Sequence, residues 1–285
     1  MEEQIKRHIS FSEFRLFNSC EFKHYLQKIL KIQEPTNEFL IFGSALHSSL
    51  EEVVAKNPNK ILYEKIFAKY LEAESNEVTV KGFFGRNLVK QGTEILKALD
   101  YFERFKDWEV VGIEDDLYEF LLQHGDIEIY FKGFIDLILK KGDKYLIIDW
   151  KSAFRPWDLD KKKEDKTFWG QLALYKHFYS IKYNIPLENI ETRFVALARE
   201  PTHIQQYSIE VSKKYMDLII NGVKQAAVDI IDRDLELPIK KAKHSKDKTA
   251  CQWCFFNKSQ KGKEKLCNDQ IGQIIEKVNE EEKTF

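Results

Sequence analysis

The stretch KGFIDLILKKGDKYLIIDWKS, from Lys132 to Ser152, constrains the fold of this chain more than any other segment. It holds two apolar runs of strand length, and the turn signal KKGDK separates them. Each run passes through an aspartate, and a lysine follows the second aspartate two residues later. The pattern therefore predicts Asp136 and Asp149 on adjacent strands.

Alternation along the second strand decides which side chains share a face. Asp149 and Lys151 are predicted to point to one face, while Trp150 points to the other and packs in the core. The run LIIDW surrounds Asp149 with large apolar residues, where a carboxylate is costly unless a metal or a cation compensates it. The alternative is an exposed aspartate–lysine pair on a hairpin surface, and these residues alone leave both interpretations open.

Two carboxylates beside a lysine suit the hydrolysis of a phosphodiester. That reaction needs the growing phosphate charge neutralised and hydroxide produced near neutral pH, which a divalent cation held by carboxylates can achieve. Hard oxygen ligands favour Mg²⁺ or Mn²⁺. We expect Asp136 and Asp149 to bind metal, and Lys151 to orient or help deprotonate the attacking water.

The rest of the chain predicts an alternation of helices and strands. Apolar spacing at helical and strand periods supports these assignments. The expected helices begin near Ser10 and near Gly43 and cover Leu88–Phe105, Phe168–Tyr183 and Val211–Ile231; the expected strands are three or four between Trp108 and Trp150, then IETRFVALAR and HIQQYSIE. Cys20 is expected on the first helix.

Length and charge limit the class of protein without naming a partner. The 285 residues suit one large domain, and 45 Lys plus Arg against 46 Asp plus Glu leave DNA contacts to local basic patches. No apolar stretch is long enough to span a bilayer, and the first ten residues lack the apolar core of a signal peptide. We expect an intracellular, cytoplasmic protein without a membrane partner.

Four cysteines are present, at Cys20, Cys251, Cys254 and Cys267. In a reducing compartment they suit metal ligation better than two disulfides, which stay open as an alternative. Four thiolates match an iron–sulfur cluster or tetrahedral zinc. Such a clamp ties the first helix to the C-terminal tail.

Four short motifs occur in a fixed order along the chain. They are a GxxxHxxxE helix from Gly43 through His47 to Glu51, a GxxD strand ending at Asp136, a DxK strand ending at Lys151, and a QxxxY helix from Gln171 to Tyr175. The ordered set resembles the RecB-like branch of the PD-(D/E)XK nucleases, which includes the AddB nuclease domain and CRISPR-associated adaptation exonucleases. The resemblance spans most of the chain.

This resemblance implies an α/β, restriction-endonuclease-like core with a central mixed sheet flanked by helices. It makes His47 a third metal ligand and assigns Gln171 and Tyr175 to the support of Lys151 and a DNA phosphate. It also leaves three roles open for Glu51, which are support of a metal ligand, help to a second metal, or a solvated position on the helix.

The layout of the cysteines resembles the iron–sulfur branch of this family and favours [4Fe-4S] over zinc. Residues 1–35 and 238–270 then bind the cluster, and residues 36–237 form a helical insertion and the catalytic core of a single domain, 1–285. The chain departs from that family layout at two points. Glu21 replaces a common proline, and the interval from Cys254 to Cys267 is long.

The activity implied is a metal-dependent deoxyribonuclease, and an exonuclease on single-stranded or end-exposed DNA is favoured. Recombination, repair, phage replication and CRISPR adaptation are the implied settings, with a helicase or a recombination or adaptation protein as partner. A GxxxxGK[ST] loop is missing from the sequence, so unwinding needs that partner. The alternatives are a catalytically silent DNA-binding or assembly subunit, a zinc-stabilised interaction protein, and a structure-specific endonuclease.

Overall fold

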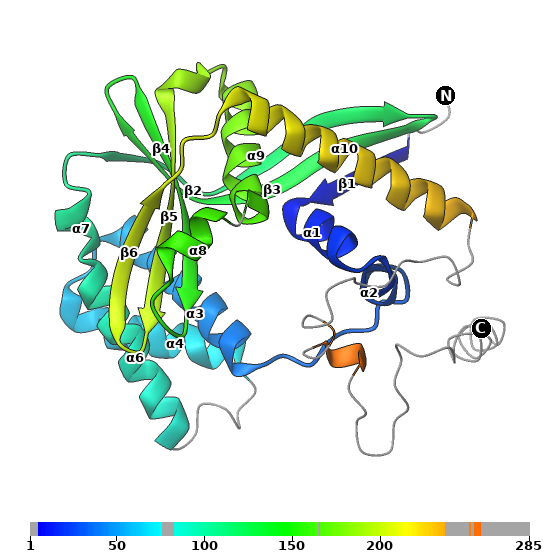
Figure 1. Ribbon diagram of the computed structural model, residues 1–285. Helices are drawn as coiled ribbons and strands as arrows, with labels where there is room; N and C mark the ends of the chain where they lie inside the picture. The colour runs from blue at the N-terminus through cyan, green and yellow to red at the C-terminus, as the bar shows by residue number, and fades with distance from the viewer. Residues whose placement is uncertain (1–4, 76–82, 165, 237–250, 252–253, 258–285) are drawn as a thin grey trace. The chain divides into compact units, whose positions relative to one another are not determined.

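A computed structural model describes residues 5–75, 83–164, 166–236, 251 and 254–257 (Figure 1). Six strands form one sheet. They are β1 (Ile5–Ser10), β2 (Glu109–His124), β3 (Ile127–Lys141), β4 (Lys144–Ala153), β5 (Ile190–Arg199) and β6 (Thr202–Ser208).

The sheet is mixed, as the sequence predicts. Its order is β1-β3-β4-β5-β6, and β2 pairs with β3 off this path. The pairs β2/β3, β3/β4 and β5/β6 are antiparallel, whereas β4 and β5 are parallel. The parallel pair requires a crossover between β4 and β5, and α9 supplies its helix.

The helices lie in three groups along the chain, between β1 and β2, between β4 and β5, and after β6. They are α1 (Phe11–Ser19), α2 (Glu21–His24), α3 (Glu38–Lys56), α4 (Tyr63–Glu74), α6 (Phe83–Leu99), α7 (Tyr101–Arg104), α8 (Leu159–Glu164), α9 (Lys166–Tyr183) and α10 (Lys213–Glu236). Short turns of other helix types are η1 (Tyr25–Ile29), η2 (Lys60–Leu62), η3 (Leu187–Asn189) and η5 (Phe255–Asn257).

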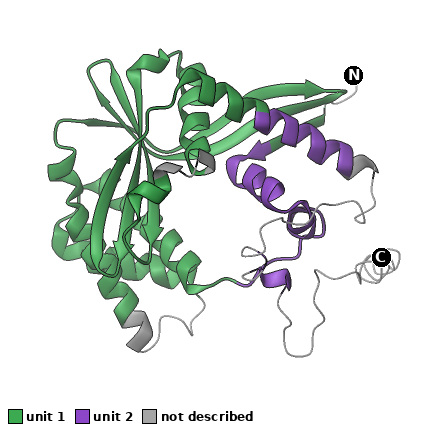
Figure 2. Ribbon diagram, viewed as in Figure 1, with its two compact units in different colours: residues 1–8, 36–221 green, residues 9–35, 222–285 purple. Residues whose placement is uncertain are grey.

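The chain divides into two compact units, which Figure 2 colours separately. Unit 1 comprises residues 1–8 and 36–221, and unit 2 comprises residues 9–35 and 222–285. In unit 1, helices cover both faces of the sheet. Phe42 and Phe67, from α3 and α4, join Trp150 of β4 in one core. On the other face, Phe178 of α9 stacks on Phe131 of β3 at 4.5 Å between ring centroids.

Unit 2 holds α1 and α2. The predicted start of this helix near Ser10 is confirmed, because the Ser10 hydroxyl caps α1 by accepting a hydrogen bond from the Glu13 N–H at 3.2 Å. The prediction that Cys20 lies on this helix is wrong. Cys20 has extended backbone angles and separates α1 from α2, where its Sγ accepts from the Lys23 N–H at 3.4 Å.

Two other helices have limits that differ from the prediction. The second helix begins at Glu38 rather than near Gly43, because Asn37 caps it by accepting from the N–H groups of the second and third helical residues. The helix expected over Leu88–Phe105 is interrupted at Asp100, whose φ of 42° is left-handed.

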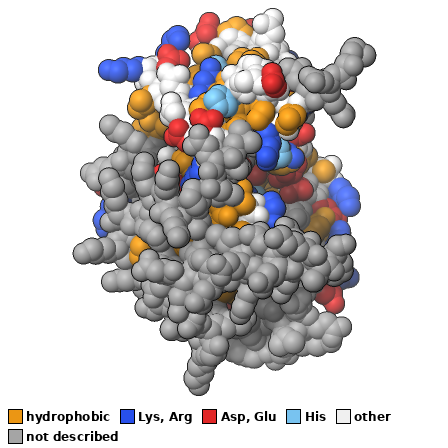
Figure 3. All heavy atoms as spheres, turned by 90° about the vertical axis from the view of Figure 1, so that its right-hand side faces the viewer, with side chains coloured by type: hydrophobic (Ala, Val, Ile, Leu, Met, Phe, Trp, Pro, Cys, Tyr) orange, Lys and Arg blue, Asp and Glu red, His pale blue; other side chains and the backbone are white. Residues whose placement is uncertain are grey.

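Surface charge follows the near-neutral composition. On the face drawn in Figure 3, acidic, basic and apolar side chains of the described residues are intermingled. None of the described helices combines the length and apolarity that crossing a bilayer requires.

Candidate metal centre and active site

The centre is built where β3 and β4 part. Their pairing runs from Lys141↔Lys144 to Leu137↔Ile148. Immediately beyond it, the Trp150 N–H donates to Oδ2 of Asp136 at 2.7 Å. The Asp136 side chain therefore satisfies a backbone donor that the separating strands leave unpaired. The predicted placement of Asp136 and Asp149 on adjacent strands is confirmed.

Asp149 is the most deeply buried carboxylate of the centre, with 1% of its surface exposed. Burial raises its pKa to about 6, against the opposing charge of Lys151. Lys151 Nζ lies 2.5 Å from Asp149 Oδ2, so the lysine charge compensates this buried carboxylate. A carboxylate has two oxygens and several lone pairs, so Asp149 can pair with Lys151 and still offer a ligand atom to a divalent cation.

Lys151 is held from α9. Its Nζ donates to Oε1 of Gln171 at 3.0 Å, and Nε2 of Gln171 donates to the Tyr175 hydroxyl at 2.8 Å. Burial raises the pKa of Tyr175, so this phenol stays protonated. A Cβ added at Gly133 would lie 2.9 Å from the Tyr175 ring, so glycine makes room for α9 against β3. The structure thus brings the DxK and QxxxY motifs together.

His47 enters the centre from α3. Its Nδ1 lies 3.4 Å from Oδ1 of Asp136. Burial acts to lower the pKa of His47, but the hydrogen bond and charge of Asp136 outweigh it and raise the pKa. A Cβ at Gly43, one turn earlier, would lie 3.0 Å from Oγ of Ser152. Glycine at this position lets α3 approach β4 closely.

Glu114 completes a group that the sequence motifs do not include. Ligand atoms of His47, Glu114 and Asp136 all lie within 4.8 Å of one another, the one such group among the described residues. Glu114 has a φ of 49°, which is rare for glutamate, and burial followed by the charge of Asp136 raises its pKa to about 7. Strained backbone at a cluster of acids is typical of functional sites.

One imidazole and several carboxylates suit a hard divalent cation. Carboxylate oxygens are preferred by Mg²⁺ and Mn²⁺, and the imidazole is tolerated best by Mn²⁺. The like-charge repulsion that raises the pKa of Glu114 and acts on Asp149 is what a bound cation relieves. The residues present therefore fit Mg²⁺ or Mn²⁺.

Comparison with known families agrees with this geometry. The sequence pattern of the PD-(D/E)XK nuclease superfamily matches residues 8–259. The chain belongs to this superfamily. Its mixed sheet flanked by helices and its acidic centre are those of a restriction-endonuclease-like core, and the membership indicates a metal-dependent nuclease with DNA as substrate.

Comparison with solved structures concerns the fold of the chain. The putative exonuclease from Eubacterium rectale is similar with a TM-score of 0.57 at 13% identity, covering 92% of this chain and 91% of that one. The structure of SSO0001 gives a TM-score of 0.36 at 13% identity over 82% and 91% of the two chains. A comparison with curated proteins gives no match.

Glu51 lies one turn beyond His47 on α3 of this nuclease core. Burial raises its pKa, and Asp136 adds to the effect while His47 opposes it. It is near enough to feel these charges, but it is not in the group of ligand atoms within 4.8 Å. Asp149 is also outside that group, but it lies on the strand that pairs with the strand of Asp136, whereas Glu51 lies one helical turn beyond His47. We therefore assign Glu51 a supporting role.

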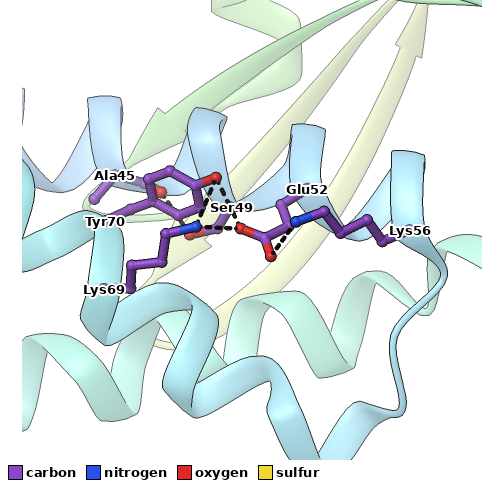
Figure 4. A network of polar contacts seen from close by, with 6 residues as sticks. All are labelled: Ala45, Ser49, Glu52, Lys56, Lys69 and Tyr70. Carbon is purple, nitrogen blue, oxygen red and sulfur yellow. Dashed lines mark hydrogen bonds and ion pairs between the residues drawn. The ribbon is translucent and has the colours of Figure 1, made fainter.

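The helix that carries His47 and Glu51 is fixed to its neighbour by a polar network (Figure 4). Glu52 of α3 accepts from Lys69 at 2.7 Å and from the Tyr70 hydroxyl at 2.8 Å, both on α4, and from Lys56 at 3.0 Å. These hydrogen bonds, that from Lys69 first, lower the pKa of Glu52 to about 2.

The cysteines are only partly brought together. In unit 2, Cys20 and Cys254 pack against the same cluster of Phe22, Tyr25, Leu26 and Phe256. Together with Cys251 they do not form a group of three ligand atoms within 4.8 Å. Cys267 lies outside the described residues, so a four-cysteine clamp is not shown.

Proposed function

We propose that this nuclease is an exonuclease that hydrolyses single-stranded or end-exposed DNA with Mg²⁺ or Mn²⁺. The observation that carries the proposal is the convergence of His47, Glu114 and Asp136 within 4.8 Å, beside the buried pair of Asp149 and Lys151. The Eubacterium rectale protein, described as a putative exonuclease, supports the exonucleolytic mode.

His47, Glu114, Asp136 and Asp149 would hold the cation. When bound, the cation neutralises charge on the phosphate and lowers the pKa of water. The protein's part is to fix these four ligands on the neighbouring strands β2, β3 and β4 and on α3, so that little rearrangement accompanies the reaction.

Lys151 would orient the attacking water and offset charge at the phosphate. Gln171 occupies one direction of its ammonium group at 3.0 Å, and Asp149 occupies another at 2.5 Å. An ammonium group has three donors, so a third hydrogen bond is left to aim at water or phosphate. Tyr175 positions Gln171 and thereby acts on Lys151 indirectly.

The test compares linear and circular single-stranded DNA of one sequence, the linear form labelled at either end, with Mn²⁺, Mg²⁺ or chelator. An exonuclease releases short products from linear DNA and leaves circles intact. Cleavage of circles would assign endonuclease action instead. Metal-independent binding without cleavage of any substrate would assign the silent DNA-binding subunit.

We also propose that unit 2 carries a [4Fe-4S] cluster on Cys20, Cys251, Cys254 and Cys267, as the cluster-binding part of one domain. The packing of Cys20 and Cys254 against one apolar cluster supports this proposal, as does the four-thiolate complement. Anaerobically purified protein should contain about four iron atoms and visible absorbance. Colourless protein with one zinc per chain would replace the cluster with zinc.

The setting in recombination, repair, phage replication or CRISPR adaptation stays a prediction, as do the helicase or adaptation partner and the intracellular location. Co-purification of tagged, full-length protein from its host would test the partner. Recovery of a helicase is the expected result, and recovery of the chain alone would argue for independent action.

A further inference from the structure

The outer parts of β2 and β3 carry aromatic side chains in solvent. Tyr118, Phe120 and Phe134 are 41%, 55% and 45% exposed. The register pairs Phe120 with Tyr130, Tyr118 with Lys132, and Phe134 with Asp116. Directly opposed residues of an antiparallel pair share a face. We call Tyr118, Phe120, Tyr130, Lys132 and Phe134 the hairpin face.

Rings and cations are interleaved on the hairpin face. Tyr118 stacks on Tyr130 at 4.7 Å between centroids and 13° between planes, and Phe120 meets Tyr130 edge-on at 6.0 Å. Lys132 Nζ lies 5.5 Å from the centroid of Phe134, and Lys6 Nζ lies 5.7 Å from that of Tyr130. Flat rings with ammonium groups beside them can receive bases and their phosphates together.

The exposure is confined to one side of the two strands. The intervening residues Leu117, Leu121 and Phe131 are buried, and Phe131 stacks on Phe178 of α9. The hairpin therefore already has a complete core on its other side. Aromatic residues in solvent on the opposite side form an apolar patch, which is typical of a binding surface.

The hairpin face begins next to the proposed metal centre. Phe134 precedes Asp136 by two residues, and its partner Asp116 follows Glu114 by two. From Asp136 to Tyr130 is six residues, about 20 Å of strand. At about 3.4 Å per stacked nucleotide this length accommodates roughly six nucleotides.

We infer that the hairpin face is a stacking track for unpaired bases of the single strand whose end lies in the metal centre. The inference rests on the proposed nuclease function and specifies its substrate as single-stranded. Paired bases hide their π-faces within a duplex, whereas unpaired bases expose them to aromatic side chains.

The charges of the track indicate that stacking, more than phosphate contact, provides its binding. Asp116 is exposed within it, and Glu128 accepts from the Tyr130 hydroxyl at 2.8 Å and lies 4.0 Å from Lys6. These acids offset the two lysines. Few released counterions imply a shallow dependence of affinity on salt.

The test measures binding of fluorescent oligo(dT) of twelve nucleotides to the full chain in chelator, by anisotropy, where no cleavage occurs. Phe120→Ala should weaken binding about tenfold, the loss of about one stacked base, while its salt dependence stays unchanged. Phe120→Tyr should retain the affinity. Ile61→Ala, which alters a side chain 81% exposed elsewhere in unit 1, is the matched control and should bind as wild type.

Three outcomes would overturn the track. Phe120→Ala could bind oligo(dT) with the affinity of wild type, or it could lose affinity for blunt duplex and for single strand equally. Alternatively, wild type could be a dimer that Phe120→Ala dissociates, which would assign the hairpin face to a second copy of the chain. Thermal melting checks that the variant is folded. Because binding is read in chelator, a failure of this inference is separate from a failure of metal-dependent cleavage.

Discussion

The metal centre of unit 1 and the cysteines of unit 2 are both assembled from distant parts of the sequence, but they converge to different degrees. His47, Glu114 and Asp136 bring ligand atoms within 4.8 Å of one another from α3, β2 and β3. Cys20 and Cys254 pack against one apolar cluster, and the described cysteines form no group of three ligand atoms within 4.8 Å.

The difference follows from what holds the ligands. Sheet register and the close approach of α3 at Gly43 hold the metal-centre side chains in place. Of the cysteines that the structure describes, Cys20 lies between α1 and α2, and Cys254 directly precedes η5. A site held by backbone ladders can be preorganised, whereas a thiolate site commonly gains its order from the metal itself.

The largest expected effect concerns Asp136, at the point where β3 and β4 separate. Asp136→Asn should lower the cleavage rate by at least about 10³-fold, because the side chain loses its charge as a ligand but can still accept from Trp150. Asp143→Asn, in the exposed turn of the same hairpin, is the control and should cleave at the wild-type rate. Equal rates for both variants would remove Asp136 from the centre.

A second comparison tests whether Glu114 or Glu51 is a ligand of the metal ion. Glu114→Gln should weaken Mn²⁺ binding at least tenfold, because it removes a charged ligand from the group within 4.8 Å. Glu51→Gln should weaken it less than threefold, since Glu51 lies outside that group. Titration calorimetry of the two folded variants gives the comparison, and a reversed order would exchange their roles.

A third variant asks whether the cysteines depend on a cofactor for order. Cys254→Ser should abolish bound iron or zinc and lower Tm by several degrees, because a bound cluster stabilises only the folded chain. Mn²⁺ affinity at the other unit should change little. Unaltered Tm and metal content would show that the thiols serve only apolar packing.

The smallest effect concerns the support of α3. Glu52→Gln should cost about 0.5–1 kcal/mol of unfolding free energy near pH 7, a value kept low because Lys56 and Lys69 are solvent-exposed. The folded pKa of Glu52 is lowered to about 2 from 4.5, so its contribution is complete above pH 4.5. It should disappear as pH falls through 2.

Denaturant unfolding of wild type and Glu52→Gln at pH 7, 4 and 2 measures this prediction. The difference in unfolding free energy should shrink at the lower pH values. A difference that grows as pH falls would mean that the network favours protonated Glu52.

Local patterns were sufficient to predict the DxK hairpin. Strand alternation placed Lys151 beside Asp149 and Trp150 in the core, and Trp150 is 2% exposed. Helical spacing likewise put Gln171 and Tyr175 one turn apart, within hydrogen-bond distance. These relations span few residues, so the period of the backbone determines them.

Glu114 could not be found in this way. Its contact with Asp136 depends on the long register between β2 and β3, including two irregularities, and on a positive φ that no local pattern predicts for glutamate. The sequence signal is an acid opposite the GxxD strand, which becomes visible only when the register is known. The break at Cys20 was missed for another reason. The apolar spacing of a helix continues from α1 into α2, whose N-terminus Cys20 caps.

The most direct test of the nuclease centre compares wild type with Lys151→Ala on end-labelled single-stranded DNA in Mn²⁺, Mg²⁺ and chelator. Lys144→Ala, on the same strand with Nζ donating to the Glu188 carbonyl, is the control. We predict cleavage by wild type and the control only with metal, and a loss of about 10²–10⁴-fold for folded Lys151→Ala. Equal cleavage by all three proteins, or none by any on single- or double-stranded DNA, would contradict the account.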